Sequence, residues 1–65
     1  MKVNKGKMYT WKSNNIPVYV LSKAKDIDMV NVLTSDQEVH HIDKGNLIDL
    51  TLDHQNLDWC RLLNN

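Results

Sequence analysis

The sequence predicts an all-β domain in which five short antiparallel strands curl around one small core. Apolar, β-branched runs alternate with polar positions at the two-residue period of strands, and short stretches rich in Asn, Asp, Ser and Gly separate them. Connections of only a few residues indicate an antiparallel meander, because a parallel pair needs a long crossover. The 65 residues are enough for a single domain, residues 1–65.

The central hairpin is predicted from residues 16–21 and 27–33, two apolar runs that flank the polar connector 22–26. Pro17 lacks an N–H group, so the first of these strands should begin beside it. That strand carries apolar side chains on both faces, which is typical of a strand that is covered on both sides or that bends to serve two sheets.

The segment before the hairpin is predicted to form a strand at residues 8–12, with Tyr9 and Trp11 on the same face. Residues 1–7 are polar, and we expect only Val3 to point inward, with a turn at Gly6. A second turn is predicted at residues 13–15, because asparagine tolerates a positive φ.

After the hairpin, a turn at 35–37 and a strand at 38–42 are predicted, followed by a 3₁₀ turn at 44–47 and a last strand at 47–52. The tail, residues 53–65, has apolar residues at helical spacings, and Asp53 could cap a helix there. This predicts a short C-terminal helix of about two turns. An extra edge strand is the alternative.

This order of elements resembles the SH3-like small β-barrels, the broad group that includes KOW, Tudor and many bacterial and phage barrels. The resemblance is in the pattern of Gly6 before Tyr9, the runs 18–21, 29–32 and 38–42, and the turn that leads into residues 46–50. It covers about residues 5–52 and implies a five-stranded antiparallel barrel, with the tail packed on the barrel or on a partner. The ligand-binding motifs of the group are not matched, so no site residue carries over.

The composition indicates a folded domain and the compartment in which it is expected. A chain with 42% apolar and 25% charged residues is typical of a folded domain rather than a disordered one. Cys60 is the only cysteine, so no internal disulfide can form, and a reducing compartment is favoured. No apolar run approaches the length of a membrane span, and the basic N-terminal region lacks the apolar core of a signal peptide. We therefore expect a cytoplasmic protein with no membrane partner.

Charge is distributed unevenly along a chain whose net charge is zero. Residues 1–25 hold six lysines and no acid, whereas residues 26–65 hold all eight acids against Lys44 and Arg61. Folding either mixes these charges or produces a bipolar surface.

Few residues are suited to chemistry. His40 and His41 are neighbours in a predicted strand and should point to opposite faces, so they cannot bind one ion together without a bulge. Adding His54 and Cys60 gives no close-set pair of metal ligands, and a Cys60–His54 dyad would lack a substrate pocket. We expect no enzyme activity, metal or cofactor, and a buried Cys60 that acts as a small apolar residue.

The sequence therefore favours an interaction module that binds a partner protein or a second copy of itself, such as a phage-type inhibitor or adaptor. Within this class, the acidic later part of the chain could cover a basic site on an enzyme or mimic the phosphates of a nucleic acid. The candidate contact residues are the exposed acids and the aromatic residues: Tyr9, Trp11, Tyr19, Asp49, Asp53, Asp58 and Trp59.

The alternative function is nucleic-acid binding. It would combine stacking on the aromatic residues with neutralisation of phosphates by lysines near the N-terminus. The candidate residues for it are Lys5, Lys7, Lys12, Lys23 and Lys25.

Overall fold

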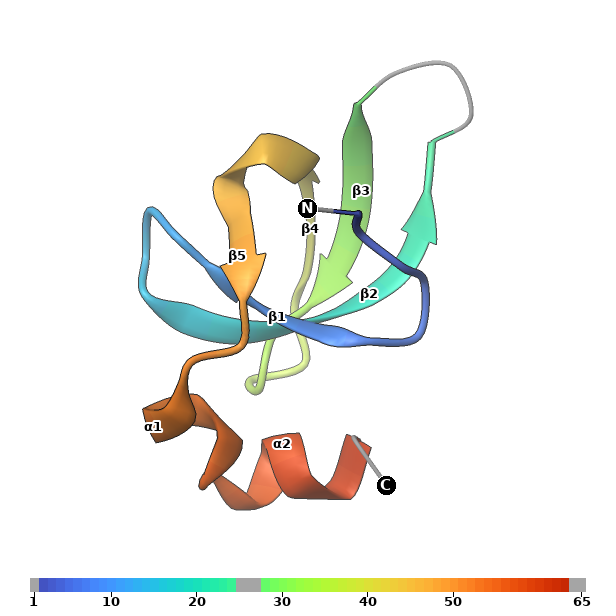
Figure 1. The fold of residues 1–65 in the computed structure, drawn as a ribbon. Coiled ribbons are helices and arrows are strands. Elements are labelled where there is room, and N and C mark those ends of the chain that lie inside the picture. The colour runs from blue at the N-terminus through green and yellow to red at the C-terminus, as the bar shows by residue number, and fades with distance from the viewer. Residues whose placement is uncertain (1, 25–27, 64–65) are drawn as a thin grey trace.

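The computed structural model describes residues 2–24 and 28–63 and contains one sheet followed by two short helices (Figure 1). The strands are β1 (Met8–Trp11), β2 (Ile16–Lys23), β3 (Met29–Leu33), β4 (Val39–Asp43) and β5 (Leu47–Asp49). A 3₁₀ turn, η1 (Lys44–Asn46), separates β4 from β5, and the helices are α1 (Leu52–Gln55) and α2 (Asp58–Leu63).

The strands pair in the order β4-β3-β2-β1-β5, and every neighbouring pair is antiparallel. The prediction of five antiparallel strands with a 3₁₀ turn before the last one is confirmed. β4 and β5 form the two edges of the sheet, and no ladder joins them within residues 2–24 and 28–63. The described strands thus form an open sheet that is strongly bent (Figure 1).

β2 supplies the bend. Its first half pairs with β1, from Ile16 opposite Trp11 to Tyr19 opposite Met8, and its second half pairs with β3. The register with β3 shifts between Val20 and Ser22, which is the mark of a β-bulge. One strand therefore serves two parts of the sheet, as its two apolar faces predict.

The core lies on one face of this bent sheet. It is built from alternate residues of the strands, as the two-residue period requires, together with Val3 of the N-terminal segment. Tyr9 is only 5% exposed, and its hydroxyl accepts a hydrogen bond from the backbone N–H of Asn4 at 2.7 Å. The buried members of the cluster are Val3, Tyr9, Val18, Val20, Val30, Val32, Ile42 and Leu47.

The end of the sheet differs from the prediction. β5 ends at Asp49 instead of continuing through residue 52, and Leu52 already begins α1. The cap of α1 is Thr51 and not Asp53, because the Thr51 hydroxyl accepts the hydrogen bond of the His54 backbone N–H. The tail forms two short helices in place of one helix of two turns, and the edge-strand alternative is wrong for its described residues.

The helices cover the second face of β1. Thr10, only 1% exposed, points away from the core, and its Oγ1 lies 2.9 Å from Nδ1 of His54 in α1. The same oxygen accepts the backbone N–H of Thr51 at 3.2 Å. Cys60 of α2 is fully buried, and Figure 1 shows both helices running below β1 and β2. Because both of its faces are covered, β1 is a structural centre of the fold.

Two residues other than glycine adopt the left-handed region in tight turns. Asn15 has φ 54°, as predicted for the turn after β1. Gln37, in the turn between β3 and β4, has φ 67°, which the sequence did not indicate. A left-handed conformation is costly for residues other than glycine and asparagine, so Gln37 stores local strain.

Replacing Gln37 with glycine should stabilise the domain by about 0.5 to 1 kcal/mol, because glycine removes the left-handed strain and returns only part of that gain as chain entropy. Urea unfolding of Gln37→Gly and wild type measures the difference. The matched variant Asn15→Gly should change stability less, since asparagine already tolerates a positive φ. A loss of stability in Gln37→Gly would contradict the strain argument.

Candidate functional site

A groove of about 410 Å³ lies where two turns of the sheet meet the C-terminal helices. Both tryptophans of the chain contribute to its walls. We call it the tryptophan groove, and its lining residues are Trp11, Asn14, Ile16, Pro17, Thr34, Ser35, Asp36, Glu38, His40, Leu57 and Trp59.

Three separate parts of the chain form these walls. The end of β1 and the start of β2 supply the first, the β3–β4 turn with the adjoining part of β4 the second, and the tail the third. The rings of Trp11 and His40 face one another across the sheet, with their centroids 5.2 Å apart and their planes tilted by 56°. Trp11 also packs against the core, so one wall of the groove is anchored in the folded interior.

Thr34 makes hydrogen bonds to both acidic residues of the groove, Asp36 and Glu38, which we call the acidic rim. This residue is 4% exposed, and its hydroxyl donates a hydrogen bond to the carboxylate of Asp36. The backbone N–H of Glu38 donates to the same hydroxyl at 3.2 Å, while the Thr34 N–H donates to the Glu38 carbonyl at 2.9 Å. The hydrogen bond from Thr34 holds the pKa of the Asp36 carboxyl below its usual value, so Asp36 is ionised at neutral pH.

The groove has a negative charge that nothing in its own walls balances. Asp36 and Glu38 line it, and both are exposed, whereas no lysine or arginine is among the lining residues that the structure describes. Trp11 adds a polar group, because its indole N–H is buried and has no acceptor among the described residues. The groove is therefore apolar and aromatic with an acidic rim.

The predicted contact residues are distributed over the molecule. Trp11 and Trp59 meet in the groove, as a shared binding surface would require, whereas Tyr9 lies in the core and Tyr19 is half-buried on β2. Asp49, Asp53 and Asp58 are exposed on β5, α1 and α2, and none of them lines the groove.

Sequence reasoning missed several groove residues. The sequence predicts Asp36, Glu38 and Pro17 only as turn or strand residues, and a turn acid is ordinarily just solvated. It brings His40 forward only as a strand residue considered for metal binding. Their common position depends on the packing of the β3–β4 turn beside β1 and the tail. The signal that the sequence does offer is the pair of tryptophans, because tryptophan is enriched among the residues that dominate binding energy at interfaces.

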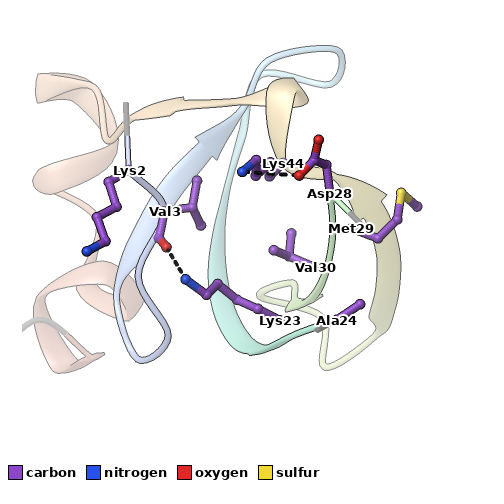
Figure 2. Close-up of a pocket in the computed structure, with 8 residues that line it drawn as sticks. All are labelled: Lys2, Val3, Lys23, Ala24, Asp28, Met29, Val30 and Lys44. Atoms are coloured by element: carbon purple, nitrogen blue, oxygen red, sulfur yellow. Dashed lines mark hydrogen bonds and ion pairs between the residues drawn. The ribbon is translucent and has the colours of Figure 1, made fainter. Parts of the chain in front are cut away.

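A second hollow, of about 310 Å³, lies beside η1, at the end of β2 and the start of β3, whereas the tryptophan groove adjoins the start of β2 and the end of β3 (Figure 2). Three lysines line it, but Figure 2 shows that two of them are engaged: Lys23 Nζ donates to the Val3 carbonyl at 3.1 Å, and Lys44 Nζ lies 3.2 Å from a carboxylate oxygen of Asp28. The lining residues are Lys2, Val3, Lys23, Ala24, Asp28, Met29, Val30 and Lys44.

The other described lysines of the nucleic-acid alternative do not line this hollow. Lys5, Lys7 and Lys12 are exposed, the first two in the segment before β1 and the third in the turn after it. Lys25 lies outside the described residues. Among the residues that the structure describes, the hollow therefore brings together only Lys23 of that predicted set, with Lys2 and Lys44.

The structure separates the residues considered for metal binding or catalysis. In residues 2–24 and 28–63, no three side chains of His, Cys, Asp or Glu are placed to hold a metal ion. His41 Nδ1 is hydrogen-bonded to Asn31 Oδ1 at 2.8 Å, and His54 Nδ1 is hydrogen-bonded to the Thr10 hydroxyl. The ring of His40 lies beside that of Trp11. Cys60 is fully buried, and this burial raises the pKa of its thiol, which disfavours the thiolate form.

Neither described helix has the length and apolar character that a membrane crossing requires. No family model matches this chain, and the searches of curated proteins and of solved structures also find no match.

Proposed function

We propose that this chain is a small interaction domain that binds a partner protein through the tryptophan groove. The observation that supports the proposal is the convergence of Trp11 and Trp59, both partly exposed, with Pro17 and Leu57 in one open groove. Tryptophan is enriched among the residues that dominate the binding energy of protein interfaces. An apolar groove with a few placed polar groups is also the ordinary form of a binding site.

We further propose that the sheet belongs to the SH3-like group of small barrels. The order of the strands, the sharp bend in β2 and the 3₁₀ turn between β4 and β5 support this relationship. Such folds host many unrelated functions, so the binding proposal depends on the groove and not on the fold.

Two leucines of the tail provide a matched test. Leu57 lines the groove and is 45% exposed, whereas Leu62 is 75% exposed and does not line it. Leu57→Arg should place a bulky charge in the groove, and Leu62→Arg should make the same chemical change elsewhere. Because both side chains are exposed, each variant should keep the stability of wild type within about 0.5 kcal/mol.

The measurement uses wild type and both variants as immobilised baits for a lysate of the source cells. Each captured protein is then purified and titrated against the three forms by calorimetry. We expect Leu57→Arg to weaken binding at least about tenfold, equivalent to 1.4 kcal/mol, and Leu62→Arg to leave it unchanged. Equal binding by all three forms, or a loss confined to Leu62→Arg, would refute the groove as the interface.

The same lysate experiment tests the nucleic-acid alternative, for which the exposed side chains of Lys5, Lys7 and Lys12 are the candidates. Nuclease treatment before capture should leave the partner bound if the groove binds protein. If nuclease removes the captured material, and binding to the purified nucleic acid falls steeply with salt, then these lysines, and not the groove, form the functional surface.

A further inference from the structure

We infer that the tryptophan groove binds a cationic side chain, arginine or lysine, projected by the partner. This inference rests on the proposed function and specifies the chemistry of its ligand. It is carried by the way that Asp36, Glu38 and the two tryptophans share one groove.

Charge gives the first argument. The groove presents two carboxylates, and no lysine or arginine is among its described lining residues. Asp36 is tied to Thr34, which keeps it ionised and fixes its position at the rim. A ligand that supplies a positive charge would therefore find the Asp36 carboxylate already positioned to accept its hydrogen bonds, with Glu38 lining the same groove.

The carboxylates of Asp36 and Glu38 also disfavour the other classes of ligand. A purely apolar segment would remove water from Asp36 and Glu38 without offering either carboxylate a hydrogen bond in its place, which costs free energy. An acidic segment would meet like charge at the rim. A cation is the ligand class that compensates for the desolvation of both acids.

The aromatic walls give the second argument. A guanidinium or ammonium group within about 6 Å of an indole face is attracted by the ring quadrupole, and tryptophan is the best aromatic residue for this interaction. Trp11 and Trp59 line the same groove as the acids, with the His40 ring beside Trp11. The aliphatic stem of arginine or lysine could pack on Ile16 and Pro17, which also line it.

The test uses small probes and the whole chain. ¹H–¹⁵N spectra are recorded while N-acetyl-arginine amide, N-acetyl-lysine amide or the neutral isostere N-acetyl-citrulline amide is added. The indole N–H signals of Trp11 and Trp59 report on the groove, and the backbone signal of Asp49 on β5 reports on a site away from it. We expect the cationic probes to shift the indole signals and to bind about three- to tenfold more tightly than citrulline amide, the ratio that a cation–π contact with nearby carboxylates should give.

A charge-neutralised variant and a control complete the design. Asp36→Asn with Glu38→Gln keeps the shape of the rim and should reduce the affinity for arginine amide to that for citrulline amide. Asp49→Asn changes the net charge from an exposed site outside the groove and should leave the indole shifts as they are in wild type.

Several outcomes would overturn the inference. These are equal binding of citrulline and arginine amides, shifts that persist in the neutralised variant, shifts centred away from the indoles, or no shift at the highest soluble concentration of the cationic probes. In each of these cases the Leu57→Arg comparison still decides on its own whether the groove binds a partner protein. If Leu57→Arg also has no effect, the proposed function fails together with its ligand.

Discussion

Replacing Tyr9 with alanine is expected to unfold the domain at room temperature. Truncating a buried aromatic side chain costs about 3 to 5 kcal/mol, and a core of this size contributes about the same net stability. Tyr9 is 5% exposed, packs in the core cluster and fixes the N-terminal segment through its bond to Asn4. Circular dichroism during urea or thermal unfolding measures the effect.

The conservative variant separates packing from hydrogen bonding. Tyr9→Phe keeps the ring and removes only the hydroxyl that accepts from Asn4, so it should cost about 1 kcal/mol and leave a folded protein. If Tyr9→Ala melted like wild type, the description of the core would be wrong. The sequence predicts Tyr9 as a partner-contact residue. The expected result would instead assign it to folding.

Local chemistry explains why much of the sheet could be predicted. Alternating valines select the inward positions of β3, and the Ser-Asn-Asn sequence favours a turn that contains a left-handed residue. The two apolar faces of β2 indicate a strand shared between two parts of the sheet, and Val3 is the only apolar residue in the segment before β1 apart from the terminal methionine.

The tail could not be predicted in detail, because two residues compete to cap its first helix. Thr51 and Asp53 both have side chains that cap helices, and the sequence alone does not choose between them. Burial of Thr10 favours Thr51, since the Thr10 hydroxyl bonds both the Thr51 N–H and His54. A contact across 41 positions of sequence thus sets the start of α1.

The candidate site could be predicted only in part, because it too depends on contacts between distant parts of the chain. Trp11 and Trp59 stand out by residue type, but they come from opposite ends of the chain, and the acids between them in sequence resemble ordinary turn residues. The left-handed Gln37 and the hydroxyl of Thr34 fold the β3–β4 turn so that Asp36 and Glu38 line the groove. No local pattern predicts that placement.

Replacing Trp59 with alanine is expected to affect both stability and binding. Trp59 is half-buried in α2, next to the fully buried Cys60, and it lines the groove. Its truncation should cost about 2 to 4 kcal/mol of folding stability, somewhat less than a fully buried tryptophan would, because part of the ring is already in water. The loss should show first in the tail, where two helices of four and six residues depend on packing to form.

Two controls distinguish these effects. Trp59→Phe retains an aromatic wall and should recover most of the stability while weakening the binding of a cation, because phenylalanine is a poorer partner than tryptophan. Leu62→Ala removes an exposed side chain of the same helix and should change neither stability nor binding measurably.

Hydrogen exchange in α1 and α2 should increase in Trp59→Ala before exchange in the sheet does, since the tail can open while the core cluster stays intact. If Trp59→Ala left melting, exchange and partner binding all unchanged, the tail would have no part in either the fold or the groove.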